Sequence, residues 1–120
     1  MILSEQMSQA ELARRVSEEL HRLGIRSTLR GHKYLAYMLM QVVSDPKQLD
    51  LVTKNLYPKT GNTFGVSMES TERAARTAIS ICWEGLGRYF LIQMACNSLD
   101  KRPTVSEFLS IVGDYIRRTS

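Results

Sequence analysis

The sequence lacks the features of several protein classes. The 120-residue chain contains no run of about 18 apolar residues, the length that a membrane-spanning helix requires. Its first fifteen residues contain no long apolar stretch of the kind found in secretory signals. It has only two cysteines, Cys82 and Cys96, and both lie inside apolar segments. We therefore expect a cytoplasmic protein in which both thiols are reduced and buried.

The residue combinations that carry enzymatic chemistry are also missing. No glycine-rich phosphate loop and no nucleophile elbow occurs in the sequence. The two histidines, His21 and His32, form no closely spaced ligand pair with the cysteines. We therefore expect no enzymatic activity, no bound metal and no cofactor.

The composition is that of a soluble globular protein. Apolar residues make up 43% of the chain and charged residues 23%, and the length fits a single domain covering residues 1–120. The formal net charge of +4 is compatible with a nucleic-acid partner, although it is too small to establish one.

Apolar residues recur at helical spacing, and no segment alternates strictly over the length of a strand. Ser8 with Glu11, and Thr104 with Glu107, have the spacing of capping boxes at helix starts. The pattern predicts about six helices, which run from Ser8 to Gly24, about 33–44, from Pro46 through Leu56, about 68–84, about 88–97 and from Thr104 through Ile116. The expected fold is all-α, in one compact domain.

Residues 58–84 have the pattern of a helix-turn-helix. Gly61, Gly65, Thr71 and Ala74 have the spacing of the small residue, the turn glycine and the inward positions of such a unit. Gly65 supplies the positive φ that a sharp turn needs, and Ser67 can cap the second helix.

The outward face of the second helix carries charged and polar side chains. These are Glu69, Ser70, Arg73, Arg76 and Thr77, with Glu72 at the border. In a helix-turn-helix such residues reach base edges in the major groove, where arginine pairs with guanine and glutamate accepts from cytosine. The same residues also fit an ordinary solvated face, because Glu69–Arg73 and Glu72–Arg76 have the i, i+4 spacing of surface ion pairs. Spacing alone leaves both interpretations open.

Four segments resemble a known family: LGIRSTLRGHKYL, LVTKNLYPKTGNTFGVS, STERAARTAISICW and KRPTVSEFLSIVGDYIR. They are similar to the C-terminal DNA-binding domain of the master sporulation response regulator of endospore-forming Firmicutes, over about residues 10–118. The resemblance implies a six-helix domain that binds promoter DNA and recruits or blocks RNA polymerase. It also implies that Glu72, Arg73 and Arg76 read bases.

The chain departs from the family pattern at three points. Ser70 stands where the family often has arginine, so the sequence preference can differ. Thr60 and Thr71 replace aliphatic residues at inward positions, which can loosen the packing. No phosphoacceptor receiver domain precedes the helices, so we expect either an excised fragment or a free-standing regulator, and both remain open.

We predict that the chain is a sequence-specific transcription regulator that binds double-stranded promoter DNA. The predicted base-contacting residues are Ser70, Glu72, Arg73 and Arg76. The predicted phosphate-contacting residues are Arg30, Lys33, Lys59, Ser67, Thr77 and Lys101. We expect a monomer in solution that pairs weakly as a dimer on DNA.

The alternative is a protein-interaction module that binds RNA polymerase or a full-length homologue. An apolar surface around Tyr89, Phe90 and Leu91 motivates this interpretation.

Overall fold

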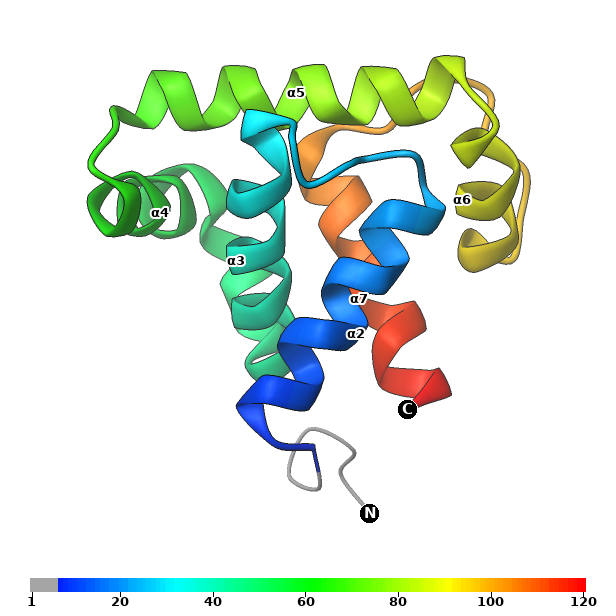
Figure 1. The fold of residues 1–120 in the computed structure, drawn as a ribbon, viewed down its shortest axis with the longest axis horizontal. Helices are drawn as coiled ribbons and strands as arrows, with labels where there is room; N and C mark the ends of the chain where they lie inside the picture. Colours follow the sequence, from blue (N-terminus) through cyan, green and yellow to red (C-terminus); the bar gives the residue numbers. More distant parts are fainter. Residues whose placement is uncertain (1–6) are drawn as a thin grey trace.

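The computed structural model describes residues 7–120, and every regular element in this part of the chain is helical. The elements are, in chain order, α2 (Gln9–Arg22), α3 (Arg30–Ser44), the 3-10 helix η1 (Pro46–Leu51), the π-helical η2 (Val52–Leu56), α4 (Tyr57–Phe64), α5 (Met68–Glu84), α6 (Gly87–Ala95) and α7 (Val105–Thr119). In Figure 1, α5 runs across the top, α4 and α6 lie at its two ends, and α2, α3 and α7 lie below it. The predicted all-α fold is confirmed. None of the helices of residues 7–120 is both long and apolar enough to cross a membrane.

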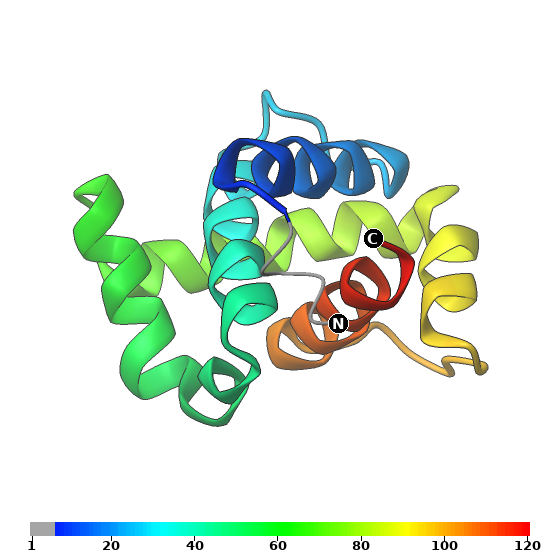
Figure 2. The same cartoon turned by 90° about the horizontal axis from the view of Figure 1, so that it is seen from below.

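Helix α3 lies at the centre of the structure and contacts α2, α5 and α7. Figure 2, seen from below, shows α2, α3 and α7 packed beneath α5. Fully buried apolar side chains fill the space between these helices, among them Leu20, Tyr34, Leu35, Met38, Leu39, Val42, Phe108, Leu109, Val112 and Ile116. Burial of each large apolar side chain contributes about 1.5–3 kcal/mol, so this cluster supplies most of the driving force for folding.

The capping box predicted at Thr104 and Glu107 is formed, whereas at Ser8 and Glu11 only the bond to the Ser8 hydroxyl is found among residues 7–120. At the start of α2, the Ser8 hydroxyl oxygen accepts a hydrogen bond from the Glu11 amide (3.1 Å). At the start of α7, the Glu107 carboxylate accepts from the Thr104 amide (2.8 Å), and the Glu107 amide donates to the Thr104 hydroxyl (3.1 Å). The bonds from Thr104 lower the pKa of Glu107, because they stabilise its charged form.

The segment from Pro46 through Leu56, predicted as one helix, is instead a 3-10 helix followed by a π-helical turn. Leu51 explains the difference. Its backbone (φ −131°, ψ 42°) lies outside the helical region, so α-helical hydrogen bonding cannot continue through it. Leu51 is exposed, whereas Val52 and Leu56 are buried. Contact with the core, rather than helical periodicity, therefore sets the path of this segment.

The two cysteines differ in exposure. Cys82 is fully buried in α5, and burial raises the pKa of its thiol to about 12. Cys96 is exposed, because it ends α6 in the left-handed conformation (φ 60°) and leaves the core there. Its sulfur accepts a hydrogen bond from Arg118 Nη2 (3.2 Å). The expectation that Cys96 is buried is therefore wrong.

Close contact between α3 and α5 depends on a glycine in the first turn of α3. Helix α3 begins at Arg30, three residues earlier than predicted, so Gly31 lies inside it. A Cβ atom at Gly31 would lie 2.9 Å from the Cβ of Ala78, and still closer to the carbonyl oxygen of Ala74. Both contacts are shorter than atoms tolerate, so α5 can approach α3 this closely only because position 31 has no side chain.

We expect Gly31→Ala to lower the free energy of unfolding by about 1–3 kcal/mol, because the added methyl group forces α3 and α5 apart. Urea unfolding followed by circular dichroism measures this change. In an unobstructed helix the same substitution stabilises by roughly 0.5–1 kcal/mol. A stabilised variant would therefore contradict the tight contact with Ala74 and Ala78.

A second prediction concerns pH. His32 of α3 is buried, its Nε2 has no hydrogen-bond partner within residues 7–120, and its ring centroid lies 5.4 Å from that of His21. Burial, and then the charge of His21, lower the pKa of His32 below 6.5. His32 therefore takes up a proton near pH 6.5 in the unfolded chain, but only at a lower pH in the folded chain. We expect stability from this group to be present above that pH and to fall as the pH drops below it.

Urea unfolding at about pH 7.5 and about pH 5.5 tests this expectation, since these values lie on either side of the ordinary histidine pKa. His32→Leu should remove much of the pH dependence, and the exposed His21→Gln should remove less. The same pH dependence in His32→Leu and the parent protein would show that other groups are responsible.

Candidate nucleic-acid interface

Helices α4 and α5 are joined by a three-residue turn at residues 65–67. Gly65 ends α4 with φ 69°, a left-handed conformation that glycine adopts at little cost. The Val66 amide donates to the Gly61 carbonyl (2.9 Å), and a Cβ at Gly61 would lie 2.6 Å from the Val66 carbonyl oxygen. Ser67 then caps α5 by accepting a hydrogen bond from the Ser70 amide (3.0 Å). This geometry is consistent with the helix-turn-helix expected over residues 58–84.

The two threonines at inward positions of this unit are fully buried. The Thr60 hydroxyl donates to the Leu56 carbonyl (2.7 Å), and the Thr71 hydroxyl donates to the Ser67 carbonyl (3.1 Å). Each hydroxyl is therefore satisfied within its own segment. The replacement of aliphatic residues by threonine leaves neither polar group unpaired.

Aromatic contacts attach α4 to α3. The Phe64 ring lies 5.3 Å from the Tyr34 ring and 5.9 Å from the Tyr37 ring, measured between centroids. The Lys33 ammonium lies 5.6 Å from the centroids of both Phe64 and Tyr34. Lys33 is exposed, as a phosphate contact requires, and its ammonium lies over the Tyr34 and Phe64 rings. The cluster and the Gly31 contact together hold the α4–α5 unit on the core.

The predicted base readers lie on the solvent side of α5. Arg73 and Arg76 are exposed, and Arg73 makes no ion pair with any residue of 7–120. Arg76 Nη2 lies 3.7 Å from Glu72 Oε2, with the two side chains 68% and 41% exposed. An ion pair this exposed is worth at most about 1 kcal/mol, so either partner can exchange it for another contact. Of the two ion pairs that would mark an ordinary solvated face, the Glu72–Arg76 pair is formed, whereas Glu69 and Arg73 form no ion pair within residues 7–120.

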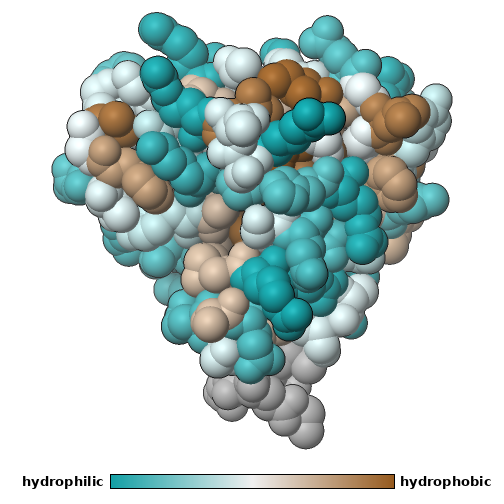
Figure 3. Space-filling view, in the orientation of Figure 1, coloured by the Kyte–Doolittle hydropathy of each residue, from teal (hydrophilic) through white to brown (hydrophobic). Residues whose placement is uncertain are grey.

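These residues divide between two flanks of α5. Ser70, Arg73 and Thr77 line a shallow hollow beside the start of α3, and Arg30 lines its other side. Glu72 and Arg76 line a larger cavity on the opposite flank, beside the start of α7. Figure 3 shows hydrophilic residues along the upper edge of the molecule, where α5 lies, with hydrophobic residues among them toward α6.

All six predicted phosphate-contacting residues are exposed: Arg30, Lys33, Lys59, Ser67, Thr77 and Lys101. The structure brings Arg30 and Thr77 together beside the predicted base reader Arg73. Lys101 lies apart from them, in a hollow beside the loop between α6 and α7.

Two further residues, Arg102 and Tyr57, lie beside the flank of α5 that carries Glu72 and Arg76. Arg102, in the loop before α7, donates a hydrogen bond to the Ser80 hydroxyl of α5. Tyr57, at the start of α4, lines the cavity that contains Glu72 and Arg76. In the sequence, Tyr57-Pro58 indicates only a break between helices, and no local pattern brings position 57 next to Arg76.

No group of three or more histidine, cysteine, aspartate or glutamate side chains within residues 7–120 is placed to hold a metal ion.

Comparison with known families identifies a family model that covers most of the chain. The family model described as sporulation initiation factor Spo0A C terminal matches residues 16–116. The matched range includes the second half of α2, all of α3 through α6, and α7 as far as Ile116. The resemblance seen in the sequence is confirmed, and the chain belongs to the family of the C-terminal domain of the sporulation initiation factor Spo0A.

Proposed function

We propose that the protein is a sequence-specific transcription regulator that binds double-stranded DNA with α5 in the major groove. The observation that carries this proposal is the pair of exposed arginines, Arg73 and Arg76, on a helix fixed by a tight turn and a close contact with α3. Membership of a family of sporulation regulators supports DNA as the partner.

The side chains on α5 have the chemistry that base recognition requires. The guanidinium of Arg73 forms no ion pair with any residue of 7–120 and can bind the O6 and N7 atoms of a guanine in bidentate fashion. Arg76 can do the same after leaving its weak pair with Glu72, whose carboxylate can then accept from the N4 amine of a cytosine. The Ser70 hydroxyl, 3.0 Å from the Ser67 hydroxyl, is short and stays close to the helix start.

Phosphate contacts would position the helix without reading sequence. Arg30 and Thr77 are suited to one DNA strand beside Arg73, since they lie around the same hollow. Lys59 and Ser67 are exposed on the α4 side of the same unit. We propose these contacts as electrostatic anchors on both sides of α5.

Fluorescence anisotropy against a pool of short duplexes tests the base-reading role. We expect Arg73→Ala to weaken binding to the preferred duplex by about 1–3 kcal/mol and to remove the preference at one base pair, because one bidentate contact is lost. Arg14→Ala is the matched control, since it removes an exposed positive charge from α2, away from α5. Unchanged affinity and preference in a folded Arg73→Ala variant would contradict this role.

The dependence of affinity on salt separates base contacts from phosphate contacts. Lys59→Ala should weaken binding to all duplexes alike and reduce the slope of log K against log salt by about one unit, because one counterion fewer is released. An equal slope in Lys59→Ala and the parent protein would exclude Lys59 from the interface.

A second function, binding of RNA polymerase, is favoured by an exposed apolar surface where α5 meets α6. Leu86 is 79% exposed and Phe90 41% exposed, and Tyr89 lies between them in sequence, also exposed. Leu91 was expected on this surface but is fully buried, and it anchors α6 to the core. An apolar surface on an anchored helix suits a protein partner.

We expect the double substitution Leu86→Ser and Phe90→Ser to reduce retention of RNA polymerase in a pull-down at moderate salt, because apolar contact area is lost. DNA affinity should stay unchanged, since both residues lie outside α5 and neither is among the proposed DNA contacts. Leu51→Ser is the control, because Leu51 is exposed to nearly the same degree as Phe90, on a different surface. Equal retention of all three proteins would exclude this surface.

A further inference from the structure

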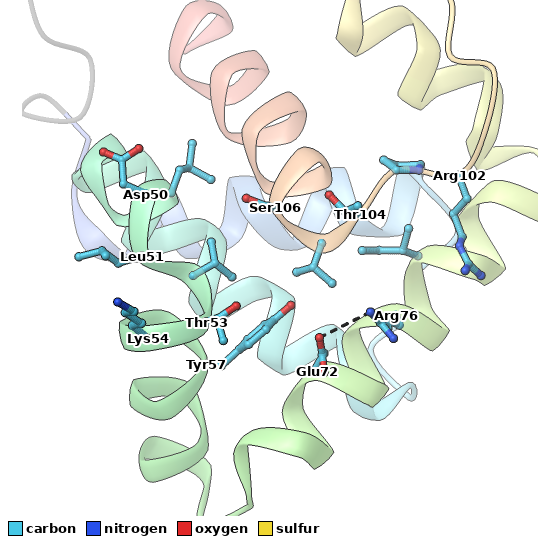
Figure 4. A pocket seen from close by; sticks show the side chains of 15 residues that line it. Asp50, Leu51, Thr53, Lys54, Tyr57, Glu72, Arg76, Arg102, Thr104 and Ser106 are labelled. Atoms are coloured by element: carbon cyan, nitrogen blue, oxygen red, sulfur yellow. Dashed lines mark ion pairs between the residues drawn. The ribbon is translucent and has the colours of Figure 1, made fainter.

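A cavity of about 700 Å³ opens between α5, the η1–η2 segment and the start of α7. Figure 4 shows the side chains that line it, with Glu72 and Arg76 on one side and Thr104 and Ser106 on another. Its volume is in the range of sites for small molecules. It is a hollow beside α5 rather than part of the outward surface of that helix.

Tyr57 is the most distinctive group in this cavity. Its side chain is almost completely buried, with 5% of the residue exposed, and its hydroxyl has no hydrogen-bond partner among residues 7–120. Figure 4 shows the hydroxyl directed into the cavity, toward the side of Glu72 and Arg76. Burial raises the pKa of Tyr57 to about 12, an effect that Glu72 increases and Arg76 opposes. The hydroxyl therefore remains protonated and is available as a donor.

The start of α7 provides further donors. The capping box engages the amides of Thr104 and Glu107, but no hydrogen bond within residues 7–120 engages the amides of Val105 and Ser106. Residues 104–106 line the cavity, and the free amides of a helix start, with the helix dipole, attract anions.

The charges around the cavity favour an anion. Lys54, Arg76 and Arg102 line it on the positive side, against Asp50 and Glu72 on the negative side, which leaves an excess of one positive charge. The pair between Glu72 and Arg76 uses one Nη2 contact of 3.7 Å, so most of the donors of that guanidinium remain free.

We propose that this cavity binds a small free oxyanion of the phosphate class, held by the Tyr57 hydroxyl, the Arg76 guanidinium and the amides of Val105 and Ser106. A phosphate in a duplex backbone is attached to two sugars, which hinders its entry into a cavity where the Tyr57 side chain is almost completely buried. A free phosphate group has no such restriction. The proposal goes beyond DNA recognition, because protein groups supply every donor of the site and no DNA is needed to form it.

The test is an NMR titration of the ¹⁵N-labelled full chain, without DNA, using inorganic phosphate and then a nucleoside monophosphate. Sodium chloride keeps the ionic strength constant. We expect saturable shifts of the Val105 and Ser106 amides. In Tyr57→Phe, the dissociation constant should rise about tenfold or more, because a hydrogen bond to a charged ligand is lost. Tyr89→Phe is the matched control, since it removes an exposed hydroxyl outside the cavity.

Three outcomes would overturn the proposal. The first is shifts that do not saturate and spread over exposed arginines and lysines. The second is equal affinity of Tyr57→Phe and the parent protein, with the fold of each verified by its amide spectrum. In a third arm, a short duplex is added instead of phosphate, and perturbation of Val105 and Ser106 by the duplex alone would assign the donors to DNA.

Discussion

The close contact between α3 and α5 determines where every other functional group lies. Gly31 brings the backbone of α3 against Ala74 and Ala78, so α5 rests on the most deeply buried helix of the structure. With α5 fixed there, the turn at Gly65 places α4 on one side, and α6 begins at the opposite end of α5. Recognition of a duplex is favoured by a rigid helix whose outer side chains are free. Little conformational entropy is then lost on binding, because the helix is already ordered.

The two flanks of α5 have different surroundings, and this gives their arginines different roles. Arg73 lies beside the start of α3, in a hollow that Arg30 and small or hydroxyl-bearing residues line and that no acidic residue of 7–120 lines. Arg76 lies beside a polar cavity and is paired with Glu72. Under the proposed function, Arg73 is available to DNA without rearrangement, whereas Arg76 must first leave a protein partner. A ligand in the cavity would act on the second arginine and not on the first.

Much of the fold can be predicted from the sequence because its signals are local. The capping pairs at Ser8 and Thr104 and the apolar stripes of α2, α5 and α7 depend on residues within a few positions of one another. The predictions fail where contacts between residues far apart in the sequence determine the backbone path or the burial of a side chain. Packing on the core, with the non-helical backbone of Leu51, divides the segment that begins at Pro46 into a tighter 3-10 helix and a looser π-helical turn. The exposure of Cys96, the burial of Leu91 and the position of Tyr57 beside Arg76 likewise depend on how α6, α7 and α5 pack.

The hydrogen bonds of Thr60 and Thr71 have a consequence for how this sequence can change over evolution. Each hydroxyl donates to a backbone carbonyl of its own segment, and within residues 7–120 neither bonds to a side chain of a neighbouring helix. Valine has nearly the same shape, and a backbone carbonyl that loses such an extra donor keeps its other acceptor site. The interior of the α4–α5 unit can therefore drift between hydroxyl-bearing and aliphatic residues while its outer surface stays constant. Substitutions at these two inward positions can therefore occur without changing what the outer face of α5 recognises.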